Sequence, residues 1–187
     1  MRTKYKAIIL IILSVIGYII QLHYQTKGIE IYNSFISEYT INSSSGLLSI
    51  LTSSFMHGNT IHILMNMFML YMLSTMFIER KSKLMTVYLL SGLLSGIFSM
   101  IYVHFVSETY VLGASGAIFG LFSYIFFRQN RRKEFYLNFF IFNIGMFLFG
   151  MNIAWYGHLG GAIAGILFYY YQNDIIPKIK RNKMRKL

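Results

Sequence analysis

Six long runs of apolar residues, almost free of charge, follow one another along the chain. They extend over Ala7–Tyr24, His57–Ile78, Leu84–Val106, Tyr110–Phe127, Phe135–Met151 and Ile153–Tyr171. Each run is about long enough to cross ~30 Å of hydrocarbon as an α-helix. Short alternating strands of the barrel type are absent from the pattern, so helices are the expected spanning form. The pattern therefore predicts an all-α membrane protein with six transmembrane helices.

The overall composition supports a lipid environment for these runs. The chain has 187 residues, of which 56% are hydrophobic and 12% are charged. A soluble domain of this size could not bury so much apolar surface. The chain contains no cysteine, which excludes disulfides, thiolate catalysis and cysteine-ligated metals.

The formal net charge of +11 would suggest nucleic-acid binding in a soluble protein. Here the basic residues lie in the connections and tails, where they are typical of topogenic signals beside membrane spans, so we expect no nucleic-acid partner. With six spans, only Lys27 among the 17 lysines and arginines falls on the outer side. The positive-inside rule then predicts a multi-pass protein of the cell membrane with its N-terminus and C-terminus in the cytoplasm.

We expect residues 1–187 to form a single membrane domain that ends in a basic cytoplasmic tail at 172–187. The first apolar run is expected to be retained, because no small-x-small cleavage site follows it. The longest outer connection, from about Gln25 to Phe55, mixes apolar and polar residues. This mixture suits a structure lying in the membrane interface, and a mobile solvated loop is the alternative.

Polar residues inside the apolar runs are few, and such residues are costly in a membrane and indicate function. The candidates are His57, His62, Asn66, Ser115 and His158. The second, fourth and sixth runs all pass from outside to inside. At about 1.5 Å per residue, the last four candidates lie roughly 7 to 15 Å below the outer surface, so we expect them in one layer. The spacing of His62 and Asn66 places both on one helix face.

Small residues flank these candidates and predict close helix contacts. They form one G-x-x-x-G pair, Gly116 and Gly120, and one longer series, Gly157, Gly161 and Gly165. A helix that begins near Ala114, below the membrane surface, would place free N–H groups and the positive end of its dipole beside Ser115. That arrangement suits an oxyanion.

The candidate residues lie in three sequence motifs: Gly113–Gly120 (GASGAIFG), His57–Asn66 (His-x4-His-x3-Asn) and Ala154–Gly161 (AWYGHLGG). These motifs resemble those of the rhomboid family of intramembrane serine proteases. The resemblance extends from about Leu48 to Tyr171 and includes Phe77–Arg80 after the second run. It implies a six-helix rhomboid-like bundle that cleaves single-span membrane proteins within or near their transmembrane segments, with no cofactor and no metal.

The resemblance also implies a role for each matching residue. Ser115 would be the nucleophile and His158 the general base of a Ser-His dyad. His62, Asn66 and the Ser115 backbone N–H would form the oxyanion hole. The supporting positions would be Gly113, Gly116, Phe119, whose ring would stack on the base, and a structural His57.

Some features depart from the family pattern. Leu48-Ser49 replaces a Trp-Arg pair common in bacterial members, and Gly157 replaces an alanine before the last-helix histidine. The only aspartate is Asp174, in the tail region, so we expect a dyad rather than a Ser-His-Asp triad.

Three other classes compete with a serine protease. A non-catalytic relative that binds transmembrane segments would typically have lost the serine or the histidine. A small transporter predicts repeats and broken helices, which the sequence does not show. An intramembrane metalloprotease needs H-E-x-x-H, whereas His57 and His62 are five positions apart with no adjoining carboxylate. The sequence leaves the natural substrate and the oligomeric state open.

Overall fold

The computed structural model describes residues 2–76, 83–148, 153–175 and 177. Within them the chain is helical and contains no β-strand, only one antiparallel bridge between Ile41 and Val111. The elements in chain order are α1 (Arg2–Gln25), α2 (Ile29–Tyr39), α3 (Ser49–Thr52), the 3-10 turn η1 (Ser53–Phe55), α4 (Thr60–Met76), α5 (Leu84–Phe105), α6 (Ser115–Arg128), α7 (Arg132–Leu148), α8 (Trp155–Tyr170) and the π-helical η2 (Tyr171–Ile175). The predicted all-α class is confirmed for this part of the chain.

Helices α1, α4, α5, α6, α7 and α8 correspond to the six predicted apolar runs, and α4, α6 and α8 begin after the first residue of their runs. Helix α4 begins at Thr60 rather than at His57. The backbone N–H of His62 donates to Asn59 Oδ1 at 2.8 Å, so the Asn59 side chain caps the helix there. The Phe77–Arg80 motif, the end of the fifth run at Met151 and most of the basic tail lie outside the described residues.

Helix α6 begins at Ser115, next to the predicted helix start near Ala114 and five residues after the apolar run begins at Tyr110. The segment before this helix is held in an extended form by backbone hydrogen bonds to the connection between α1 and α4. Val111 donates to the carbonyl of Ile41 at 2.8 Å, and Gly113 donates to the carbonyl of Ser53 at 2.8 Å. These bonds hold the residues before Ser115 outside the helix, so the apolar run begins as a loop before it turns helical.

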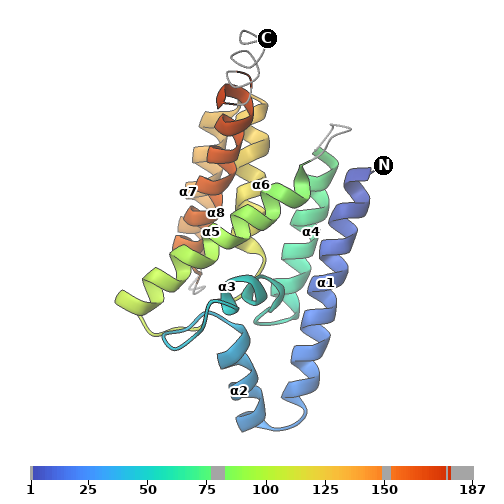
Figure 1. Ribbon diagram of the computed structural model, residues 1–187, viewed down its shortest axis with the longest axis vertical. Coiled ribbons are helices and arrows are strands. Elements are labelled where there is room, and N and C mark those ends of the chain that lie inside the picture. The colour runs from blue at the N-terminus through green and yellow to red at the C-terminus, as the bar shows by residue number, and fades with distance from the viewer. Residues whose placement is uncertain (1, 77–82, 149–152, 176, 178–187) are drawn as a thin grey trace, which may run out of the picture.

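Two helical segments of the described residues are long and apolar enough to cross a membrane by length and composition, Tyr5–Thr26 and Leu84–Phe105. Helices α4 and α6 are apolar but shorter. Figure 1 shows that α1 begins and α8 ends at the same end of the bundle, with α2 at the opposite end. A chain whose first helix begins and whose last long helix ends at the same end of the bundle passes along the bundle an even number of times.

The tightest packing joins α5, α6 and α8, whereas α1 packs on α4 and α7 lies mainly against α6. Glycines make the α6–α8 contact possible, as the sequence predicts. A Cβ added to Gly161 would collide with the carbonyl of Gly116, and one added to Gly120 would lie 2.7 Å from the carbonyl of Gly161. The Ser123 hydroxyl also donates to the carbonyl of Ala162 at 2.9 Å. The two backbones therefore touch, and this contact fixes the start of α6 against the start of α8.

The connection between α1 and α4 is folded rather than extended. Phe35, Ile36 and Met56 form a small apolar cluster, against which Tyr24 of α1 and Leu112 of the loop before α6 pack. Where the sequence departs from the family's Trp-Arg pair, Leu48 is exposed and Ser49 is buried; the Ser49 hydroxyl donates to the carbonyl of Gly46 at 2.7 Å. This connection positions the loop that leads to Ser115.

Candidate active site

Ser115 and His158 lie within hydrogen-bonding distance, although they are far apart in sequence. Ser115 is the first residue of α6, and His158 lies in the first turn of α8. The distance between Ser115 Oγ and His158 Nε2 is 2.9 Å. His158 is only 4% exposed, whereas Ser115 is partly exposed, so the ring is more enclosed than the serine. This geometry allows proton transfer between the two groups.

A third polar residue, Asn143 of α7, completes a chain of contacts that the sequence analysis missed. Its Oδ1 lies 2.8 Å from His158 Nδ1, and its Nδ2 donates to the Phe139 carbonyl at 2.8 Å. The available signal was an asparagine inside the apolar run Phe135–Met151. That signal marks a polar group in an apolar helix but does not say which neighbour it faces.

Aromatic rings enclose the His158 imidazole. The Phe119 ring lies 4.4 Å from it, centre to centre, at an interplanar angle of 32°. Phe142 of α7 approaches the same ring edge-on at 6.0 Å. Phe119 is four residues after Ser115, so both side chains lie on one face of α6. The arrangement agrees with the stacking position that the family resemblance implies for Phe119.

His62 and Asn66 meet the backbone at Gly113, two residues before Ser115. The His62 Nε2 atom lies 2.9 Å, and the Asn66 Nδ2 atom 3.5 Å, from the place that a Gly113 Cβ would take. Asn66 Nδ2 is buried and has no hydrogen-bond partner among the described residues. The Gly58 N–H points to His62 Nδ1 at 3.4 Å, which favours the proton on Nε2. Both side chains therefore present a donor towards the loop that carries Ser115.

The backbone at Ser115 adds further donors. Helix α6 has no side-chain N-cap, because Ala114 occupies the cap position. The first intrahelical bond of its backbone runs from Ile118 N–H to the Ala114 carbonyl at 3.0 Å. The N–H groups of the first turn therefore point out of the helix beside the Ser115 hydroxyl, at the positive end of the helix dipole.

His57 lies beside this site rather than in it. It is fully buried, and its ring meets the His62 ring edge-on at 5.2 Å. The side-chain amide of Gln21 on α1 bonds to both backbone groups of His57. Its Nε2 donates to the His57 carbonyl at 2.7 Å, and its Oε1 accepts from the His57 N–H at 3.1 Å. These contacts suit the supporting role that the motif implies, since they hold the residue that packs against His62.

Gly113→Ala is expected to slow the reaction of Ser115 by roughly 10-fold or more. Gly113 has φ +123°, and a Cβ there would lie 2.7 Å from His62 Cε1. The variant would therefore combine backbone strain of about 1–3 kcal/mol with displacement of the His62 ring. Gly28→Ala is the matched control, because Gly28 has φ +113° and no atom within 4 Å of its added Cβ. Thermal unfolding measures the backbone strain in each variant, and the rate at which a fluorophosphonate labels Ser115 measures the displacement of the His62 ring. Equal labelling rates in both variants would contradict the collision with His62.

Comparison with known proteins places this site in a family. The model of the Rhomboid domain matches residues 44–173, which include every candidate site residue. The chain belongs to the rhomboid family. This family generally includes serine proteases, and the protein is a rhomboid-domain membrane protein.

Three mitochondrial proteins of this family are similar in sequence to this chain. The presenilin-associated rhomboid-like proteins, mitochondrial, of Rattus norvegicus, Pongo abelii and Homo sapiens are each 29% identical to this chain over 171 residues. The aligned region covers 80% of this chain and 45% of each relative. The rhomboid chain described here therefore spans less than half the length of these relatives.

Proposed function

We propose that this rhomboid protein is an intramembrane serine endopeptidase that cleaves single-span membrane proteins within or near their transmembrane segments. The observation that carries the proposal is the 2.9 Å contact between Ser115 Oγ and His158 Nε2. A serine hydroxyl is a weak nucleophile by itself and needs a base within hydrogen-bonding reach. The glycine-mediated contact between α6 and α8 supplies that proximity.

The proposed reaction has two stages, with His158 moving one proton in each. Ser115 Oγ attacks the carbonyl carbon of the scissile peptide bond while His158 Nε2 accepts the hydroxyl proton. His158 then gives this proton to the leaving amine, so the C–N bond breaks and an acyl ester remains on Ser115. Water, deprotonated by His158, attacks the ester; the bond from the acyl carbon to Ser115 Oγ breaks, His158 returns the proton to Oγ, and the new carboxyl end is released. The reaction requires no cofactor.

The oxyanion formed in each stage would be held by the Ser115 backbone N–H, His62 and Asn66. The unpaired Asn66 Nδ2 supports this assignment, because a buried donor without an acceptor is costly unless a reacting group uses it. Such donors are already oriented before the charge develops, so they need no reorganisation during the reaction.

We also propose that the chain crosses the cell membrane six times, with both termini in the cytoplasm. The distribution of lysine and arginine supports this topology, as does the common end of the bundle at which α1 begins and α8 ends (Figure 1). The names of the curated relatives place those proteins in mitochondria. The bilayer and single-span substrates are the proposed partners of this chain.

The function is tested by reconstituting the purified protein in lipid vesicles with a single-span substrate and, separately, with a fluorophosphonate probe. We expect a cut in or near the substrate's transmembrane segment and a covalent adduct that peptide mapping assigns to Ser115. Ser123, on the same helix, serves as an internal control, because its hydroxyl donates to the backbone carbonyls of Gly120 and Ala162. An intact substrate together with an unmodified Ser115 would overturn the proposal.

His62→Ala and Asn66→Ala are each expected to lower kcat by about 10- to 1,000-fold, as for the loss of an oxyanion donor. Labelling of Ser115 should slow in parallel, because the probe also passes through a charged intermediate. His104→Ala is the matched control; this exposed histidine lies in the last turn of α5, away from Ser115. Steady-state cleavage in vesicles measures the effect. Unchanged kcat in both site variants would remove these residues from the oxyanion hole.

A further inference from the structure

We propose that Asn143 is a positioning residue, which holds the His158 imidazole in the tautomer that can accept the Ser115 proton. The inference rests on the proposed function, since it names a third member of the same site. The observation behind it is a continuous series of hydrogen bonds from the α7 backbone to the nucleophile. It links the Phe139 carbonyl, the Asn143 amide, the His158 ring and the Ser115 hydroxyl.

The direction of this series is fixed at its α7 end. A backbone carbonyl can only accept a hydrogen bond, so the atom of Asn143 that lies 2.8 Å from the Phe139 oxygen must be the amide nitrogen. The amide oxygen then faces His158 Nδ1, at 2.8 Å. Rotating the amide by half a turn would bring two carbonyl oxygens together and lose this bond. The orientation of Asn143 thus follows from its own helix.

The fixed amide determines the protonation of His158. An amide oxygen can only accept, so Nδ1 of the neutral ring must carry the proton. Nε2 is then left with its lone pair, and it lies 2.9 Å from Ser115 Oγ. The opposite tautomer would place two acceptors, Asn143 Oδ1 and His158 Nδ1, face to face, and its Nε2 could not take a proton. Asn143 therefore selects the reactive form of the ring before substrate arrives.

The surroundings make this selection necessary. The other ring contacts of His158 are with Phe119 and Phe142, which confine the imidazole plane but do not distinguish its two nitrogens. In addition, α7 is exposed along most of its length and only Phe135 is buried among its residues. Among the described residues, the hydrogen bond between Asn143 and His158 is thus the polar contact through which the position of α7 can influence the His158 ring.

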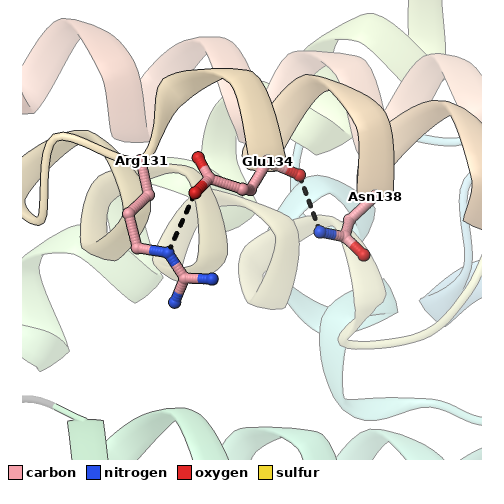
Figure 2. A network of polar contacts seen from close by, with 3 residues as sticks. All are labelled: Arg131, Glu134 and Asn138. Carbon is pink, nitrogen blue, oxygen red and sulfur yellow. Dashed lines mark hydrogen bonds and ion pairs between the residues drawn. The ribbon is translucent and has the colours of Figure 1, made fainter.

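The same helix contains a matched control, Asn138. Its Nδ2 donates to the Glu134 carbonyl at 2.7 Å, the same bond to the fourth residue before it that Asn143 makes. Figure 2 shows this contact beside the half-exposed ion pair of Arg131 and Glu134, at 3.4 Å. Asn138 is exposed, so replacing it changes the helix propensity and removes the side-chain bond to the helix backbone, as replacing Asn143 does, but leaves His158 untouched.

The test combines kinetics in vesicles with ¹⁵N NMR of the histidine ring. Asn143→Leu is expected to lower kcat by about 10- to 100-fold with KM within about 2-fold, since only the protonation and orientation of the base change. Asn143→Asp keeps an acceptor oxygen for His158 Nδ1 but loses the bond to the Phe139 carbonyl, so it is expected to recover part of the lost kcat. Asn138→Leu should match the native protein. In the native protein the ring nitrogen shifts of His158, assigned with His158→Ala, should report a proton on Nδ1; in Asn143→Leu they should report a mixture of tautomers.

Two results would overturn the inference. One is a native His158 ring with its proton on Nε2, and the other is Asn143→Leu with native kcat. Asn143→Ala provides a second variant without added bulk, and the native spectrum needs no variant at that position. The tautomer is also readable in a protein that cleaves nothing. A failure of the proposed protease function would therefore appear as no cleavage by the native chain, separately from the outcome for Asn143.

Discussion

Ser115→Ala is expected to lower substrate cleavage by at least about 10⁴-fold and to abolish reaction with a fluorophosphonate. The variant removes the atom that forms the covalent intermediate, and no other hydroxyl is bonded to His158 among the described residues. Only slow attack by water, aided by the oxyanion donors, would remain. Cleavage of a single-span substrate in vesicles, followed over days, gives the residual rate.

The control for this variant is Ser123→Ala on the same helix. The Ser123 hydroxyl donates to the carbonyls of Gly120 and Ala162, at 3.0 and 2.9 Å. Its loss should cost about 1 kcal/mol of stability and leave kcat within about 3-fold of the native value. Thermal unfolding of both variants checks that Ser115→Ala remains folded. Cleavage by folded Ser115→Ala at the native rate would end the serine-protease proposal.

The helices were predictable from the sequence wherever hydrophobicity alone decides them. The predicted runs at Leu84–Val106 and Ile153–Tyr171 differ from α5 and α8 by at most two residues at either end. Other helices extend past the apolar run: α7 begins at Arg132, before the predicted Phe135, with Glu134 in its first turn. A helix does not stop where the lipid-compatible residues stop, because charged residues are good helix formers and continue into water.

The start of α6 illustrates what hydropathy cannot specify. The residues from Tyr110 to Gly113 are apolar or neutral, yet they are extended because their backbone pairs with Ile41 and Ser53. Partners so distant in sequence leave no periodic signal. The sequence did, however, predict a helix that begins near Ala114, one residue before the observed start at Ser115.

The missed residue, Asn143, shows the same limitation for a side chain. The sequence places an asparagine among phenylalanines, but its contact with His158 depends on how α7 lies against α6. By contrast, the pairing of Ser115 with His158 could be anticipated, because Gly116, Gly157 and Gly161 on the two helices predict that their backbones touch. Small residues carry tertiary information that a single polar residue does not.

His158→Ala is expected to lower cleavage on the order of 10⁴-fold, nearly as much as Ser115→Ala. Without the ring, the Ser115 hydroxyl has no base at 2.9 Å and the leaving amine has no proton donor. Fluorophosphonate labelling should fall with cleavage, since both need the proton to be removed. Alanine leaves Asn143 bonded to the Phe139 carbonyl, so α7 keeps its own contact and the fold should persist. The measurement is kcat in vesicles beside the labelling rate.

The double variant Ser115→Ala/His158→Ala decides whether the two residues act as one unit. Groups that share one proton transfer are not additive, because removing either already prevents the step. We therefore expect the double variant to cleave no more slowly than either single variant. If the two residues contributed independently, their effects would multiply to a loss of about 10⁸-fold. A double variant that cleaves more slowly than both single variants would indicate such independence. Such a result would show that the 2.9 Å contact is not the basis of catalysis.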